Sequence, residues 1–196
     1  MPRPAPTTAR RSLPNQVRII GGHWKRTKLE VPERPGLRPT PDRVRETLFN
    51  WLGQDLAGWR CVDAFAGTGA LGLEAASRGA ADVLLVEADG ALVDALRAVV
   101  KRLDAGNVRV QRGNALTVLA GLPAGGTDLV FLDPPFEAGL FDQALAAALP
   151  ALAPQGLIYL EAPTLWDGEA LARRGLEALR HLKAGAVHGH LLRRTA

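Results

Sequence analysis

The sequence lacks several features that define whole classes of protein. Its 196 residues include a single cysteine, Cys61, so no disulfide can form within the chain. No run of eighteen apolar residues occurs, which excludes a transmembrane helix of ordinary length. Residues 1–14 hold charges but no apolar segment of the kind found in secretory signals. Together with the length, these absences predict a cytoplasmic protein that is one ordinary domain, or one domain with an extension, and that has no membrane partner.

Candidate metal ligands are also scarce. The four histidines occupy positions 23, 181, 188 and 190, without the HxxH spacing or the cysteine partners of common zinc sites. We therefore expect no bound metal.

Positive charge is concentrated near the N-terminus. Residues 1–45 hold eleven Lys or Arg and three acids, whereas residues 46–196 hold thirteen against seventeen. Such an asymmetry is typical of an arm that binds a polyanion. Residues 1–16 are predicted to be a flexible tail, and residues 17–53 a basic hairpin followed by a helix.

The hairpin is predicted at residues 17–29, with Gly21 and Gly22 at its turn or at a bulge. Basic residues alternate there with Trp24. Its ring suits either a nucleic-acid base or the core of a small satellite sheet, and both interpretations remain open.

The helix is predicted to start near Thr40. Thr40 is the expected N-cap, Pro41 occupies the first turn, and Asp42 complements the helix dipole. Arg43 and Arg45 oppose that dipole, which indicates that they serve a ligand rather than the helix. The candidate nucleic-acid contacts are the basic residues of this arm: Arg18, Lys25, Arg26, Lys28, Arg38, Arg43 and Arg45.

Residues 54–196 alternate between strand and helix patterns. Buried strands are predicted at 61–64, 83–87, 108–112, 129–133 and 157–161, with helices at 71–78, 90–103, 115–122 and 137–149. Two further strands, 176–183 and 187–194, read as a closing antiparallel hairpin. Repeated strand–helix units predict an α/β fold with a mainly parallel, doubly wound sheet.

A glycine-rich loop follows the first of these strands. It runs from Asp63 through Gly67, Thr68 and Gly69 to the start of a helix, which lets the backbone approach a ligand. Glu87 ends the next strand, where an acid can bind ribose hydroxyls. A dinucleotide site has a similar pattern, but Asp63 would repel a pyrophosphate. Its charge suits a cationic amino group, such as the methionyl ammonium of S-adenosylmethionine.

The end of the third strand offers a polar contact. Asn114, with Ala115 beside it, is expected to hydrogen-bond an adenine edge, to cap the following helix, or to do both.

The stretch Asp133-Pro134-Pro135-Phe136 closes the fourth strand. Its two prolines stiffen the corner and leave carbonyl oxygens free as acceptors. A carboxylate, free acceptors and a flat ring together suit a planar amine on a base. At the carboxyl end of a parallel strand, this corner lies where open α/β sheets bind ligands.

These motifs resemble the class I (Rossmann-like) S-adenosylmethionine-dependent methyltransferases that act on amino groups. More closely, the chain is similar to the bacterial 16S rRNA (guanine(966)-N2)-methyltransferase family. The similarity extends from Arg18 to Arg194. It rests on the segments 18–22, 37–52, 63–69 and 133–136, of which 37–52 is the most specific to the family.

The resemblance implies a seven-stranded sheet of order 3-2-1-4-5-7-6 with the last strand antiparallel. It implies that residues 54–196 bind S-adenosylmethionine and catalyse transfer, with 16S rRNA or the 30S subunit as partner, and we expect a monomer. Thr40-Pro41 is similar to an upstream cofactor-contact motif. The predicted cofactor contacts are Thr40, Asp63, Gly67, Thr68, Gly69, Glu87, Ala88, Asn114, Ala115 and Asp133. The predicted catalytic residues are Asp133, Pro134, Pro135 and Phe136.

Three other functions are compatible with parts of the pattern. A DNA adenine-N6 methyltransferase shares the corner motif, although many of those enzymes have Asn where this chain has Asp133. A non-catalytic RNA-binding assembly protein could use the same scaffold. In such a protein the catalytic site would have lost its motif residues, but here the acids Asp63, Glu87 and Asp133 are all present. A nicotinamide-dependent oxidoreductase would leave the corner unexplained.

Overall fold

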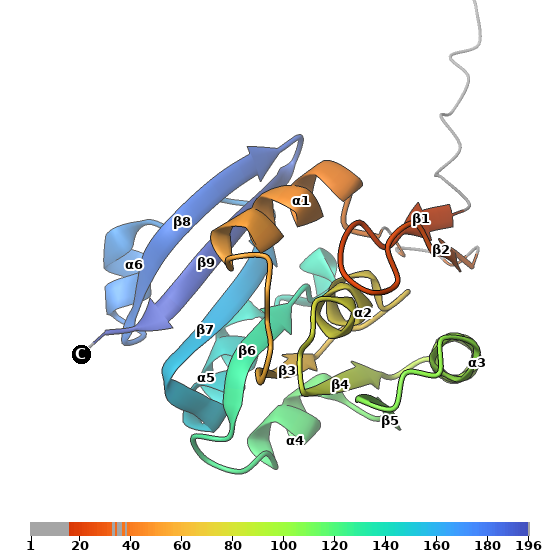
Figure 1. The fold of residues 1–196 in the computed structure, drawn as a ribbon. Helices are drawn as coiled ribbons and strands as arrows, with labels where there is room; N and C mark the ends of the chain where they lie inside the picture. Colours follow the sequence, from red (N-terminus) through yellow and green to blue (C-terminus); the bar gives the residue numbers. More distant parts are fainter. Residues whose placement is uncertain (1–15, 33, 35–36, 38, 196) are drawn as a thin grey trace, which may run out of the picture.

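The computed structural model describes residues 16–32, 34, 37 and 39–195. Its centre is a seven-stranded sheet of order β5-β4-β3-β6-β7-β9-β8 (Figure 1). Counted in chain order, this is the predicted 3-2-1-4-5-7-6. β9 alone runs antiparallel to its neighbours, so the predicted topology is confirmed. The strands are β3 (Arg60–Asp63), β4 (Asp82–Glu87), β5 (Val108–Arg112), β6 (Thr127–Leu132), β7 (Leu152–Ala162), β8 (Leu176–Ala184) and β9 (Val187–Arg194).

Helices cover both faces of the sheet, because its strands have apolar side chains on both sides. In β6, Leu129 and Phe131 belong to one core cluster, and Val130 and Leu132 to the other. The first cluster includes side chains of α1 (Asp42–Trp51), α2 (Ala70–Ser77) and α3 (Gly90–Arg102). The second includes side chains of α4 (Ala115–Ala120), α5 (Phe141–Ala148) and α6 (Gly168–Ala172).

Most predicted elements occur within a few residues of their expected bounds, with two differences. The helix predicted at 137–149 is divided into η1 (Phe136–Ala138), α5 and η2 (Leu149–Ala151). Gly139, between η1 and α5, adopts a left-handed φ of 62°, which ends the first helical segment. Pro150 has no N–H group to donate, so α5 does not continue through it. The five-residue helix α6 was not predicted. In the described part of the chain, none of the helices is both long and apolar enough to span a bilayer.

The predicted N-terminal hairpin is confirmed as β1 (Gln16–Arg18) paired antiparallel with β2 (Lys28–Glu30). Its connecting loop rests on α2 (Figure 1). His23 N–H donates to Ser77 O at 2.7 Å, and Trp24 N–H to Ser77 Oγ at 2.9 Å. Gly22 has a φ of 73°, and a Cβ there would lie 1.8 Å from Ser77 O. This close approach explains the need for glycine at position 22.

A buried carboxylate, Glu74 of α2, joins this loop to two helices. Its oxygens accept the backbone N–H groups of Ile20 and Gly21, both at 2.7 Å. They also accept the guanidinium groups of Arg45 from α1 at 3.2 Å and of Arg78 at 2.9 Å. Four donors therefore offset the cost of removing this charge from water.

Two expectations about the start of α1 are wrong. The N-cap is Pro41 rather than Thr40, and no side chain caps the helix, because the Thr40 hydroxyl donates elsewhere. Arg45 is fully buried and donates to Thr40 O, Asp42 and Glu74. Its side chain binds groups inside the protein and does not reach the surface, so the prediction that Arg45 contacts nucleic acid is wrong. Residues 1–15 and Arg38 lie outside the described residues.

We predict that Glu74→Ala lowers the free energy of unfolding by about 3–5 kcal/mol, because it leaves the buried charges of Arg45 and Arg78 without their shared carboxylate partner. Urea denaturation followed by circular dichroism would measure this change. A matched control is Glu169→Ala, since Glu169 pairs with Arg173 at the same i,i+4 spacing but on the surface. Exposed pairs contribute little. Similar losses in the two variants would contradict the role assigned to Glu74.

Candidate functional site

Four acidic side chains lie at the carboxyl ends of four strands. Asp63 and Glu87 end β3 and β4, Asp133 directly follows β6, and Glu161 lies near the end of β7. Each lies two residues beyond a member of the first core cluster: Cys61, Leu85, Phe131 and Tyr159. Since side chains alternate along a strand, all four acids lie on the face covered by α1, α2 and α3. No Lys or Arg of the described residues forms an ion pair with them.

Asp63 is the most enclosed of the four, with 2% of its surface exposed. Its Oδ2 accepts the N–H of Gly72 at 2.9 Å. Burial raises the pKa of Asp63 to about 7; the Gly72 N–H opposes this rise, and Glu87 and Glu161 add to it. A Cβ on Gly72 would lie 2.2 Å from Leu85, so glycine here lets α2 approach the sheet closely.

The glycine-rich loop lies between Asp63 and α2. Gly67 and Gly69 both have positive φ angles, 53° and 77°. Glu87 accepts the N–H of Gly67 at 2.9 Å and that of Ala88 at 2.8 Å. The Thr68 hydroxyl is buried and has no hydrogen-bond partner among the described residues. The loop thus holds a buried polar atom that lacks a protein partner, as ligand sites often do.

The Asp133–Phe136 corner lies at the next strand end. Pro134 is buried, Pro135 is exposed, and the half-buried Phe136 ring lies 6.0 Å from that of Phe141. Burial raises the pKa of Asp133 well above its usual range, and the charges of Glu161 and Asp63 raise it further.

Glu161 was not among the predicted site residues. It is buried, and its Oε1 accepts the hydroxyl groups of Thr40 at 2.9 Å and Tyr159 at 3.0 Å. Burial raises its pKa, which these two hydrogen bonds oppose. The structure therefore brings Thr40 to the acidic edge through Glu161. The sequence did contain a signal for Glu161, because each of the parallel strands β3, β4, β6 and β7 has an acid at or next to its carboxyl end.

Asn114 lies beyond β5 and caps α4. Its Oδ1 accepts the N–H of Thr117 at 3.1 Å, as the capping interpretation expects. Ala115 packs in the second core cluster. The contact of Asn114 with an adenine stays a prediction.

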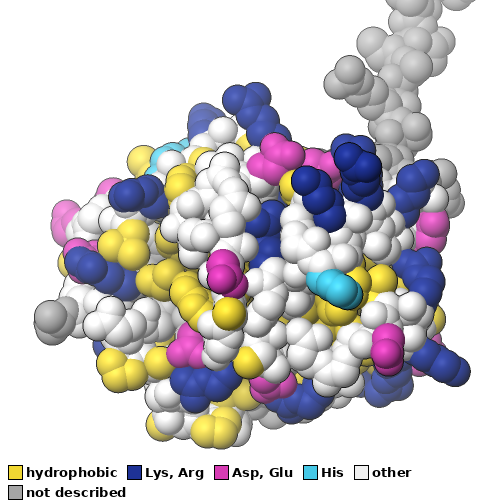
Figure 2. Space-filling view, viewed as in Figure 1, with side chains coloured by type: hydrophobic (Ala, Val, Ile, Leu, Met, Phe, Trp, Pro, Cys, Tyr) yellow, Lys and Arg dark blue, Asp and Glu magenta, His cyan; other side chains and the backbone are white. Residues whose placement is uncertain are grey.

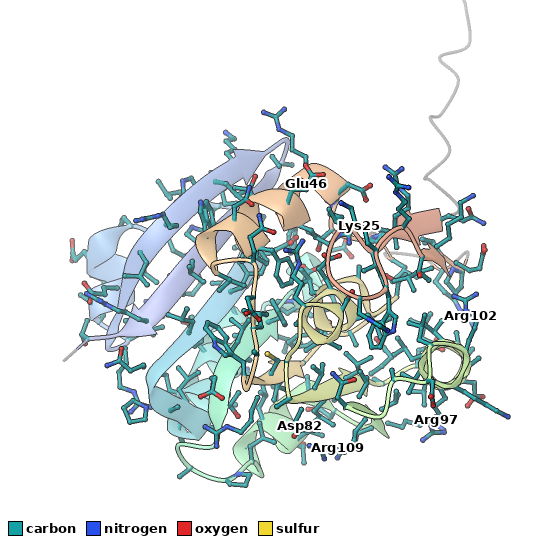
Figure 3. The ribbon with its side chains drawn as sticks, in the orientation of Figure 1. Lys25, Glu46, Asp82, Arg97, Arg102 and Arg109 are labelled. Atoms are coloured by element: carbon teal, nitrogen blue, oxygen red, sulfur yellow. The ribbon has the colours of Figure 1, made fainter. Side chains whose placement is uncertain are left out.

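Five predicted nucleic-acid contacts are exposed. Lys25 lies on the loop of the N-terminal hairpin (Figure 3). Trp24 is half-buried against the first core cluster, which accords with a satellite sheet. Figure 2 shows Lys and Arg side chains along the rim formed by β1, β2 and α1. The five exposed residues are Arg18, Lys25, Arg26, Lys28 and Arg43.

The described residues contain no group of three or more His, Cys, Asp or Glu side chains arranged to hold a metal ion.

The sheet order, the glycine-rich loop and the acids at the strand ends define a class I methyltransferase. A solved structure from Escherichia coli, of a protein described as a candidate methyltransferase, has this fold. It superposes with a TM-score of 0.77 at 40% identity, over 92% of this chain and 98% of that one. This chain belongs to the ribosomal RNA small subunit methyltransferase D family, as its motifs predicted.

Sequence comparison supports this assignment. Residues 17–193 match the family model described as Conserved hypothetical protein 95. The chain is 50% identical over 150 residues to Ribosomal RNA small subunit methyltransferase D of Escherichia coli K12, covering 74% of each. It is 40% identical over 151 residues to the protein of that name in Haemophilus influenzae, covering 74% of this chain and 78% of that one.

The raised pKa of Asp63 predicts a particular pH dependence of stability. Between the usual value of 3.8 and about 7, the folded state holds a proton that the unfolded state has lost. The free energy of unfolding should therefore fall as pH rises through this window, by about 4 kcal/mol at most. Asp63→Asn should remove this contribution, as measured by urea denaturation at several pH values.

The control for this experiment has the opposite sign. The hydrogen bond from Arg60 lowers the pKa of Asp128. Asp128 therefore contributes stability at neutral pH that is lost as pH falls. Asp128→Asn should change the slope in the other direction. Equal slopes in wild type and Asp63→Asn would refute the assignment to Asp63.

Proposed function

We propose that this protein transfers a methyl group from S-adenosylmethionine to the exocyclic N2 of a guanine, guanine(966), in 16S rRNA of the 30S subunit. We propose that it acts in the cytoplasm as a monomer. The observation that carries the proposal is the Asp133–Phe136 corner beside three further strand-end acids. The names of the relatives from Escherichia coli and Haemophilus influenzae support rRNA as the substrate class.

The residues at the sheet edge fit S-adenosylmethionine. Asp63 suits its ammonium group, Glu87 its ribose hydroxyls, and Gly67–Gly69 the close passage of backbone. The unpartnered hydroxyl of Thr68 and the absence of a described cation beside the acids fit a polar, cationic ligand. The bound cofactor supplies an activated methyl group on a sulfonium.

The corner fits the target amine. Asp133 and the carbonyl oxygen of Pro134 accept its N–H groups and offset positive charge that develops on the nitrogen. Phe136 stacks on the base. A base held in this way must be unpaired or flipped out of its helix, which favours a loop of RNA.

The ionised form of Asp133 offers the amine more acceptor sites than the protonated form does. The raised pKa of Asp133 favours the protonated form. A cation bound beside Asp63 lowers the pKa of both carboxyls and so favours the acceptor form of Asp133. We therefore expect cofactor binding to precede productive binding of the base.

The exposed basic residues supply phosphate contacts. Arg18, Lys25, Arg26, Lys28 and Arg43 lie on the hairpin and at the start of α1, next to the segment that ends in Thr40. Phosphate contacts of this kind orient an RNA without reading its sequence.

The direct test uses S-adenosylmethionine with a tritiated methyl group and either 30S subunits or free 16S rRNA. Nucleoside analysis should find the label in N2-methylguanosine. Label in N6-methyladenosine of DNA would support the adenine enzyme instead. No transfer to any nucleic acid would support a non-catalytic scaffold.

We predict that Asp133→Ala lowers kcat about 10²–10³-fold, because it removes an acceptor from the reacting amine. Asp133→Asn keeps one carbonyl acceptor and should lose less. Calorimetry should show that both variants still bind S-adenosylmethionine. Asp94→Ala is the control, since Asp94 pairs with Arg97 on the exposed face of α3, away from the corner. Unchanged methyl transfer in Asp133→Ala would exclude this role.

A further inference from the structure

An aromatic chain leads away from the catalytic corner on the other face of the sheet. The Phe136 ring lies 6.0 Å from that of Phe141, which lies 6.3 Å from Trp166. The Arg174 guanidinium lies 4.7 Å from the centre of the Trp166 ring. Trp166 N–H in turn donates to His190 Nε2 at 3.1 Å. The corner is thus joined by contacts to β9.

The tip of the β8–β9 hairpin lies at the same edge of the sheet as the four acids, because β8 runs parallel to β7. Lys183 pairs with His188, and His181 with His190. The rings of His181 and His188 stack 5.1 Å apart at 24°, and a 2.9 Å hydrogen bond joins them. The His181 ring also lies 5.0 Å from that of His190, which accepts the Trp166 N–H, so the stack is on the Trp166 side of the sheet.

The surface so formed is both apolar and basic. Leu165 is 56% exposed, and it is the one large hydrophobic side chain that lies exposed in the described part of the chain. Lys183 and His181 are also exposed, and no described acid pairs with Lys183. A cation, an apolar side chain and ring faces together suit an unpaired nucleic-acid strand.

We propose that Leu165, Lys183 and the His181–His188 stack bind unpaired RNA nucleotides that flank the target base. This rests on the proposed RNA substrate and adds a second contact surface to it. A base drawn onto Phe136 leaves its helix, and its neighbours lose stacking partners. The surface begins at the aromatic neighbours of Phe136 and offers those nucleotides new apolar contacts and a phosphate partner.

Fluorescence anisotropy with labelled single-stranded RNA of roughly ten nucleotides tests the surface directly. The double variant Leu165→Ala, Lys183→Ala should weaken binding about ten-fold, as expected for one base contact and one phosphate contact. Lys183→Ala alone should lower the salt slope by about 0.7. Lys25→Ala should also weaken binding. The matched control is Lys101→Ala, an exposed lysine in the last turn of α3, which should bind like wild type.

Three results would overturn the proposal. The first is unchanged affinity in the double variant, whose exposed positions leave folding intact. The second is an equal loss of affinity for duplex RNA, which would indicate phosphate attraction alone. The third is a loss of methylation with assembled 30S subunits but not with free 16S rRNA, which would assign the surface to a ribosomal protein.

The same variants separate this surface from the proposed activity. If wild type binds RNA through Leu165 and Lys183 but forms no N2-methylguanosine, the proposed activity is refuted and the proposed RNA-binding surface is supported. Normal methylation by wild type, with the double variant unchanged in its KM for 30S subunits, would refute the surface and keep the activity. The KM for S-adenosylmethionine should not change in either variant.

Discussion

The Glu74 carboxylate is the interaction on which the arrangement of the N-terminal third depends. It accepts two backbone N–H groups of the hairpin loop and two guanidinium groups, one from α1 and one from its own helix. A buried carboxylate is tolerated only when its partners are complete. Since α2 also begins at the loop Gly67–Gly69, the basic hairpin and the proposed cofactor loop are attached to one helix.

A second buried carboxylate makes a similar connection on the other side of the site. Glu161 accepts the hydroxyl of Thr40, the residue before the Pro41 N-cap of α1, and that of Tyr159 inside the sheet. The segment before α1 is therefore fixed to the edge where Asp63 and Asp133 lie. Burial raises the pKa of all three of these carboxyls, and such perturbed acids collect at functional sites.

Much of this could be predicted from the sequence, because local periodicity records which faces are buried. Strand and helix patterns predicted the sheet, and acids next to Gly or Pro marked Asp63 and Asp133. Arg45 was misjudged because its partner, Glu74, lies 29 residues away and no local pattern reveals it. Glu161 was missed because it ends its strand without a neighbouring glycine loop or proline pair.

The site combines charges of opposite sign, and this sets the order of its proposed steps. The exposed rim is basic, which in the proposed function attracts a polyanion, whereas the strand-end acids offer its phosphates no cationic partner. A cationic ligand bound at the acidic edge would lower the pKa of Asp133 and favour its ionised acceptor form, while its own charge would balance that of the carboxylate. We infer that the rim governs how fast RNA arrives and that the acidic edge governs whether a base can enter. In the proposed function, electrostatic attraction and base capture thus depend on different residues, and the buried carboxylates Glu74 and Glu161 hold those residues in one arrangement.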